Sequence, residues 1–96
     1  MGVEIVRCKD AAAYLGRSDV MIVDLRSPEQ FLMQHVPDAY NLQMDKIEAW
    51  MYRLPKDRLI LFYCDHGNYS LMAAKKCSRR GLRTAALLGD ISCFWQ

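Results

Sequence analysis

The sequence predicts an α/β fold, in which one domain has a mostly parallel central sheet of about five strands with helices on both faces. Residues 20–25 and 58–64 are apolar almost throughout, which is typical of strands buried on both faces of a parallel sheet. Segments with a strand-like pattern alternate with segments that favour helix, and this order indicates strand–helix–strand units. A length of 96 residues suits one domain, which we expect to span residues 1–96.

Five segments are expected to form the strands. Residues 3–8 alternate between apolar and polar side chains, as a half-buried strand does. Residues 20–25 and 58–64 are the two fully buried strands. Residues 39–42 suit a short strand, and residues 82–89 suit the last one.

Two of the expected helices carry start signals at their first residues. Residues 9–17 contain three consecutive alanines after Asp10, a plausible N-cap, and end near a glycine. Residues 27–35 begin with Ser27 as N-cap and Pro28 in the first helical position. Both segments are therefore predicted to be helical.

Three further segments are expected to be helices or turns. Residues 44–54 place apolar side chains at helical spacing on one face, at Ile47, Trp50, Met51 and Leu54. Residues 70–81 favour a helix that starts at Ser70, as its N-cap, and stops at Gly81. Residues 90–95 suit a terminal turn or short helix.

Composition and charge exclude several classes of protein. The chain is 52% hydrophobic and 25% charged, as globular proteins are. A net charge of +2 gives no reason to expect nucleic acid or a membrane as a partner. We see neither a signal peptide nor an apolar run of roughly 20 residues, so we expect a cytoplasmic protein with reduced thiols. The cysteines form no Cys-x-x-Cys pair, and we expect no metal and no cofactor.

The segment "YCDHGNYS" is the strongest candidate for a functional site. Cys64 ends a buried strand, where ligands bind in open α/β sheets. Ser70 opens the next expected helix, whose N-terminal N–H groups favour an anion such as a thiolate. Gly67 allows a tight turn that brings its amide near the sulfur, and Asn68 tolerates left-handed geometry. We therefore predict a reactive Cys64, whereas the cysteines at positions 8, 77 and 93 suit inert core packing.

Three motifs in this order resemble those of the rhodanese-like domain, and the similarity covers nearly the whole chain. "VDLRSPEQFLMQHVPDAYNL" resembles the early signature of that family, and "YCDHGNYS" resembles its Cys-x-x-Gly-x-x-Ser active-site loop. "GLRTAALLGDISCFW" resembles the closing signature. The loop is most similar to that of single-domain thiosulfate sulfurtransferases.

The resemblance implies a sulfurtransferase that needs no cofactor. Cys64 would take a sulfane sulfur from a donor such as thiosulfate or a persulfide, and pass it to a thiol or cyanide acceptor through a Cys64 persulfide. The partners would be a small-molecule sulfur donor and a protein or thiol acceptor. The implied active-site loop consists of Asp65, His66, Gly67, Asn68, Tyr69 and Ser70.

Departures from the family pattern keep an alternative open. Tyr69 stands where many members have Arg or Thr, so the loop has no cation of its own, and Asp65 adds a negative charge beside the sulfur. Gln34 and Asp90 each replace a usual glycine. The alternative is a sulfur carrier or protein-interaction module with little thiosulfate activity. A phosphatase or arsenate reductase is disfavoured, because such enzymes need Cys-x5-Arg and Ser70 stands in the arginine position.

Other polar residues have two interpretations each. His66 either stabilises the thiolate and steers the donor or faces solvent. Tyr69 suits the pocket rim better than a direct substrate contact. We expect Asp24 and Arg26 to form a salt bridge that fixes a turn rather than to contact substrate directly. We expect His35 to make a structural hydrogen bond rather than to act as a base. The basic residues after Ser70 form a solvated face or attract an acidic partner; they are Lys75, Lys76, Arg79 and Arg80.

Overall fold

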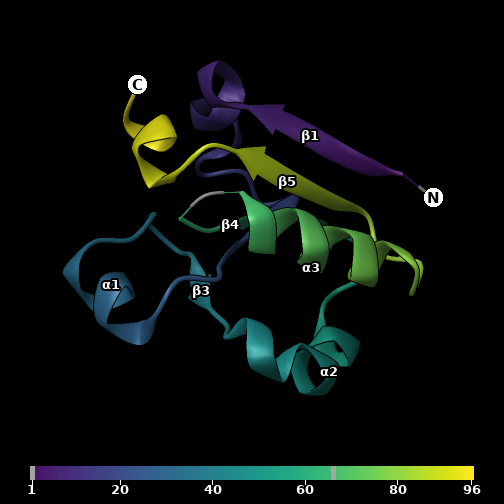
Figure 1. Ribbon diagram of the computed structural model, residues 1–96. Coiled ribbons are helices and arrows are strands. Elements are labelled where there is room, and N and C mark those ends of the chain that lie inside the picture. Colours follow the sequence, from purple (N-terminus) through teal and green to yellow (C-terminus); the bar gives the residue numbers. More distant parts are fainter. Residues whose placement is uncertain (1, 66) are drawn as a thin grey trace.

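The computed structural model describes residues 2–65 and 67–96 and contains one sheet of five parallel strands. The strands lie in the order β1-β5-β4-β2-β3. Each neighbouring pair is parallel, which confirms the predicted fold class (Figure 1). The strands are β1 (Val3–Arg7), β2 (Val20–Asp24), β3 (Tyr40–Asn41), β4 (Leu59–Tyr63) and β5 (Thr84–Leu88).

Helical segments cover both faces of the sheet. Helices α2 (Ile47–Trp50) and α3 (Asn68–Ser78) contribute to the hydrophobic cluster on one face, together with η3 (Met51–Arg53). The 3-10 segments η1 (Cys8–Tyr14) and η4 (Ile91–Trp95) contribute to the cluster on the other face. The remaining helical segments are α1 (Pro28–Met33) and η2 (Met44–Lys46).

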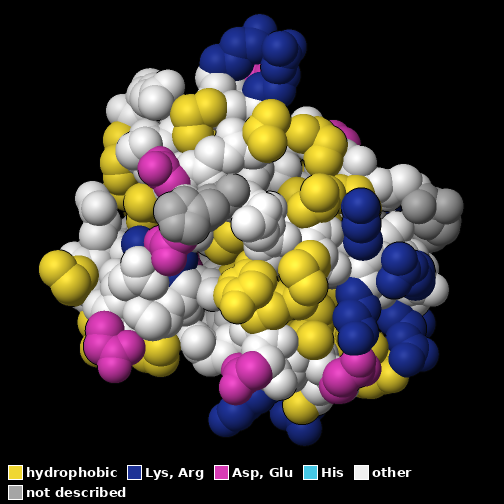
Figure 2. All heavy atoms as spheres, in the orientation of Figure 1, with side chains coloured by type: hydrophobic (Ala, Val, Ile, Leu, Met, Phe, Trp, Pro, Cys, Tyr) yellow, Lys and Arg dark blue, Asp and Glu magenta, His cyan; other side chains and the backbone are white. Residues whose placement is uncertain are grey.

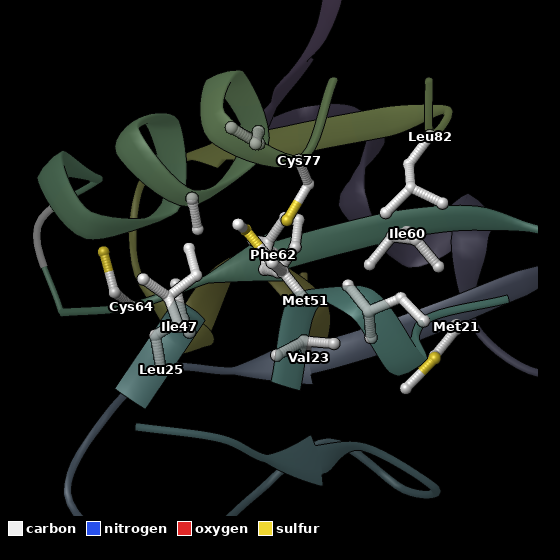
Figure 3. Packing of buried hydrophobic residues seen from close by; sticks show 14 residues of the cluster. Met21, Val23, Leu25, Ile47, Met51, Ile60, Phe62, Cys64, Cys77 and Leu82 are labelled. Carbon is white, nitrogen blue, oxygen red and sulfur yellow. The ribbon is translucent and has the colours of Figure 1, made fainter. Parts of the chain in front are cut away.

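The central strands are buried on both faces, as their continuous apolar sequences predict. In β4, Ile60 and Phe62 point into the cluster beneath α3, whereas Leu61 and Tyr63 point into the opposite cluster. This division follows from the two-residue period of a strand, which sends successive side chains to opposite faces. Figure 3 shows the first cluster, in which the sulfur of Cys77 reaches down from α3 toward Phe62.

The start of α1 is confirmed in detail. Ser27 is the N-cap and accepts a hydrogen bond from the Gln30 N–H at 3.2 Å, and the Gln30 side chain in turn accepts one from the Ser27 N–H at 3.1 Å. Pro28 occupies the first helical position. This reciprocal capping box satisfies backbone donors that a helix start would otherwise leave unpaired.

The segment after Asp10 is helical, as predicted, but Asp10 as its N-cap is wrong. The segment is a 3-10 helix that already begins at Cys8, and Asp10 does not cap it. The Leu15 N–H bonds to the Ala12 carbonyl at 3.2 Å, three residues back. Seven residues with one buried side chain, Ala11, give an α-helix little packing to stabilise it.

The segment over residues 44–54 is helical but changes type along its length. It runs through η2, α2 and η3 rather than one continuous helix. The predicted apolar face is nevertheless confirmed, because Ile47, Met51 and Leu54 are buried and Trp50 packs against the same cluster. The Trp50 indole N–H donates to the Gln43 carbonyl at 2.8 Å.

The expectation of reduced thiols is wrong for two of the four cysteines. Cys8 and Cys93 form a disulfide, whereas Cys64 and Cys77 are free. Cys8 follows β1 and Cys93 follows β5, and these strands are parallel neighbours, so the chain leaves both at the same edge of the sheet. Gly89 lies against this bond, because a Cβ there would stand 2.6 Å from the Cys93 sulfur.

Within residues 2–65 and 67–96, no helix is long and apolar enough to cross a membrane.

Candidate active site

Cys64 lies directly after β4, beneath the first turn of α3 (Figure 3). Its sulfur accepts a hydrogen bond from the Gly67 N–H at 3.1 Å, and the Ser70 N–H points to it at 3.4 Å. Gly67 has φ +86°, a left-handed conformation in which a side chain would be strained. The predicted approach of the Gly67 amide to the sulfur is thereby confirmed, and the geometry suits a negative charge on that sulfur.

Ser70 has a different place from the predicted one. It is not the N-cap, because α3 begins two residues earlier and Gly67 precedes its first residue. The Ser70 side chain is buried, with its hydroxyl 2.9 Å from the Gly67 carbonyl and 3.4 Å from the Leu87 carbonyl. It thus ties the loop to β5. Asn68 is the first helical residue and does not use left-handed geometry.

Cys64 is only 4% exposed, but it lines a pocket of about 720 Å³. The pocket lies at the carboxyl ends of β2 and β4, where an open α/β sheet is expected to bind ligands. Its lining consists of Leu25, Arg26, Ser27, Gln43, Met44, Asp45, Cys64, Asp65, Asn68 and Tyr69. The segment 43–45 was not predicted to take part, because its sequence has the pattern of a helix start and nothing in it marks a site.

A buried charge pair fixes the neighbouring turn, as predicted. Arg26 donates to the Asp24 carboxylate at 2.9 Å, and the Tyr63 hydroxyl donates to the same carboxylate at 2.5 Å. Burial disfavours the charge of Arg26, but hydrogen bonds and attraction from Asp24 outweigh it and raise the pKa of the guanidinium. Burial, and then the bond to Asp24, raise the pKa of Tyr63. Asn41 closes the turn by donating to the carbonyls of Asp24 and Arg26 at 3.1 and 3.0 Å.

Asp65 is held at the pocket by a residue of α1. The Gln30 side-chain amide donates to both of its carboxylate oxygens, at 3.0 and 3.2 Å. Tyr69 is 52% exposed at the pocket rim, in agreement with the rim interpretation. His66 lies outside the described residues. His35 is exposed, stacks on the Phe31 ring and lies 2.8 Å from the Phe31 carbonyl through its Nδ1, which supports a structural role.

Cys77 is the second free cysteine and has a different environment. It is fully buried in the cluster beneath α3, and burial raises its pKa to about 11. Its thiol therefore stays protonated at neutral pH, as predicted for core packing. Among the described residues, no group of His, Cys, Asp and Glu side chains is arranged to hold a metal ion.

The family model of the rhodanese-like domain matches residues 8–93. The chain belongs to the rhodanese-like domain family. The match includes the early motif, the whole of the Cys64 loop and the closing motif as far as Cys93.

Solved structures show the same rhodanese-like fold. A rhodanese-related protein from Thermoplasma volcanium is 20% identical, with a TM-score of 0.84 over 96% of this chain and 90% of that one. A rhodanese-like domain protein from Staphylococcus aureus is also 20% identical, with a TM-score of 0.83 over 96% of this chain and 91% of that one. A Rhodopseudomonas palustris protein of unknown function, described as a possible tyrosine phosphatase, is 28% identical. Its TM-score is 0.83 over 97% of this chain and 80% of that one.

Proposed function

We propose that this rhodanese-like domain is a sulfurtransferase whose catalytic residue is Cys64. The observation that carries the proposal is the pair of backbone N–H groups, from Gly67 and Ser70, directed at the Cys64 sulfur. Such donors stabilise the thiolate that attacks a sulfur donor and the anionic persulfide that follows. The pocket beside the sulfur offers room for donor and acceptor in turn.

The reaction proceeds in two steps. In the first, the Cys64 thiolate attacks the outer sulfur of a donor such as thiosulfate. A new S–S bond forms to Cys64, the donor's own S–S bond breaks, and sulfite leaves with the electron pair. In the second step, a thiol or cyanide attacks the outer persulfide sulfur, and the Cys64 thiolate is restored. The two half-reactions share one pocket, which predicts ping-pong kinetics.

The rest of the loop positions the backbone N–H groups that point at the Cys64 sulfur. The left-handed Gly67 turns the chain around the sulfur, and the Ser70 hydroxyl holds the turn to the Gly67 and Leu87 carbonyls. The dipole of α3 adds positive potential at the same point. Neither Asn68 nor Tyr69 supplies a formal charge, so backbone groups make the main contribution from this part of the loop.

A second candidate function is a sulfur carrier that receives and donates sulfur with little thiosulfate activity. The observation that favours it is the placement of Asp65, whose carboxylate lines the pocket beside Cys64. A carboxylate there repels the thiosulfate dianion. A phosphatase function has no support in the loop, because Ser70 occupies the position at which Cys-x5-Arg enzymes bind the oxyanion with arginine.

The test is intact-mass spectrometry of the protein after incubation with thiosulfate. We expect the mass to increase by one sulfur atom and to return to its original value when cyanide is added. Cys64→Ser should not gain sulfur, whereas Cys77→Ser should gain it as the wild type does. A wild-type protein that gains no sulfur from thiosulfate, from inorganic polysulfide or from a persulfide donor would contradict both candidate functions. Gain from polysulfide or persulfide but not from thiosulfate would favour the carrier.

A further inference from the structure

We infer that the mouth of the Cys64 pocket selects a cationic thiol as the sulfur acceptor. The inference rests on the proposed function and names the chemical class of its second substrate. It follows from the charges that line the pocket, from the way one of them is held, and from the apolar residues that line the same pocket.

Two carboxylates line the pocket from different segments of the chain. Asp65 follows Cys64 directly, whereas Asp45 lies in η2, which reaches the pocket from the connection between β3 and α2. Both side chains are exposed, so an incoming molecule meets them before it reaches the buried sulfur. A pocket lined by one sign of charge raises the local concentration of the opposite sign.

Asp65 is fixed in place. Gln30 donates to both of its oxygens, while the Gln30 carbonyl oxygen accepts from the Ser27 N–H and hydroxyl, at 3.1 Å each. The amide is thus held at one end by the start of α1 and holds the carboxylate at the other. Its hydrogen bonds leave the charge of Asp65 uncompensated, because Gln30 is neutral. An acidic group with a fixed position discriminates between ligands better than a mobile one.

The one guanidinium in the described lining does not cancel these charges. Arg26 is 8% exposed and pairs with Asp24, and its Nη2 group also donates to the Gln34 carbonyl. Lys and Arg side chains gather over the C-terminal half of α3, on the far side from the turn that holds Cys64 (Figure 2). There Lys76 pairs with Glu48. The described part of the pocket mouth is therefore net negative.

The pocket also has apolar lining. Leu25, Met44 and the ring of Tyr69 line the same pocket, and Tyr69 is half exposed. Such a surface suits a short aliphatic chain, and an aromatic face also attracts an ammonium group. An aliphatic thiol that carries an ammonium group matches both features, whereas thiosulfate, a small dianion, matches neither.

The transfer to this acceptor balances without another reactant. The acceptor thiolate attacks the outer sulfur of the Cys64 persulfide and forms a new S–S bond. The bond between the two persulfide sulfurs breaks, and its electron pair returns to Cys64 as a thiolate. The outer persulfide sulfur takes up the proton that the acceptor thiol released as it ionised, so the products are the acceptor persulfide and the Cys64 thiolate.

The experiment isolates this step. The protein is loaded with sulfur from thiosulfate or inorganic polysulfide and desalted, and loss of the extra sulfur is followed by intact mass. Three acceptors are compared: cysteamine as the cation, 2-mercaptoethanol as the neutral thiol and 3-mercaptopropionate as the anion. Each rate is divided by the thiolate concentration of that acceptor, because the thiolate is the nucleophile.

We expect cysteamine to discharge the persulfide about tenfold faster than 3-mercaptopropionate at low salt, with 2-mercaptoethanol between them. The ratio should shrink at high salt. Asp65→Asn and Asp45→Asn should each lower it about threefold. Asp57→Asn is the matched control, because it removes the same charge before β4, at the opposite end of that strand from Cys64, and should leave the ratio unchanged.

The outcomes separate this inference from the proposed function. Equal normalised rates for the three thiols would overturn the inference and leave the sulfurtransferase proposal standing, since the persulfide would have formed and discharged. A charge preference that neither Asp45→Asn nor Asp65→Asn reduces would overturn it as well. Failure of the wild type to take up sulfur from any donor would remove the proposed function and this inference together.

Discussion

The left-handed turn at Gly67 allows a test of whether the Gly67 N–H stabilises the Cys64 thiolate. In Gly67→Ala, the added Cβ would meet the Leu87 carbonyl at 3.7 Å, an ordinary contact, so the cost comes from φ +86°. An L-residue in this conformation costs about 1–2 kcal/mol. We expect the loop to relax toward negative φ and to withdraw the Gly67 N–H from the Cys64 sulfur.

The chemical effect can be estimated from that one hydrogen bond. A hydrogen bond to a charged group contributes about 1.5 kcal/mol or more, which corresponds to about a tenfold change in an equilibrium. A thiolate that loses such a bond is also more nucleophilic, and this offsets roughly half of the effect on a logarithmic scale. We therefore expect alkylation of Cys64 by iodoacetamide at neutral pH to slow about threefold.

Gly81→Ala is the matched control for this variant. Gly81 has φ +87° and open space around its Cα, and it follows α3 at the end remote from Cys64. The free energy of unfolding, measured with urea, should fall by about 1–2 kcal/mol in both variants. Only in Gly67→Ala should the alkylation of Cys64 be slower. If iodoacetamide alkylates Cys64 at the wild-type rate in both variants, the Gly67 amide does not stabilise the thiolate, and this part of the proposed mechanism is refuted.

Three further predictions concern charge, the disulfide and the buried thiol. Tyr69→Arg should lower the Michaelis constant for thiosulfate at low salt and less so at high salt, because it adds a cation at the pocket rim; an unchanged constant would mean that the rim does not contact the donor. Reduction of the Cys8–Cys93 disulfide, which spans 85 residues, should lower the free energy of unfolding by about 4 kcal/mol in urea titrations, and the double variant Cys8→Ser/Cys93→Ser should not respond to reductant. In Cys64→Ser, ultraviolet absorbance should show the Cys77 thiolate forming near pH 11, after subtraction of the same titration with Cys77→Ala. Because the pKa of a cysteine thiol in the unfolded chain is near 9.0, Cys77 should destabilise the fold progressively from about pH 9 upward. Thiolate absorbance near pH 9 in the folded protein would contradict this.

Local patterns in the sequence predicted most of the fold. The apolar runs of β2 and β4 are recognisable because a strand buried on both faces needs side chains of one kind throughout. Ser27 and Pro28 mark the start of α1 because capping involves residues close in the chain. The place of Cys64 was predictable for the same reason, since strand end, glycine and helix start lie within seven residues.

Some predictions from local sequence patterns were wrong, because contacts with distant parts of the chain determine the structure there. Asp10 and the alanines after it favour an α-helix, but only Ala11 of that segment is buried, and a 3-10 helix tied to η4 formed instead. Serine is a common N-cap residue, which favours a helix start at Ser70. The backbone turn at Gly67 instead lets α3 begin two residues earlier. Propensity is a weak influence that tertiary contacts override.

The sequence by itself determined the order of the strands along the chain, the family motifs and the cysteine most suited to react. Only the tertiary structure decided which distant residues meet. It joins Cys8 to Cys93 because their strands became parallel neighbours, and it brings Asp45 to the pocket of Cys64. Gln30 reaches Asp65 across 35 positions of the chain in the same way. Periodicity and capping act over a few residues, whereas these contacts depend on the topology of the sheet, which places the ends of separate strands at one edge.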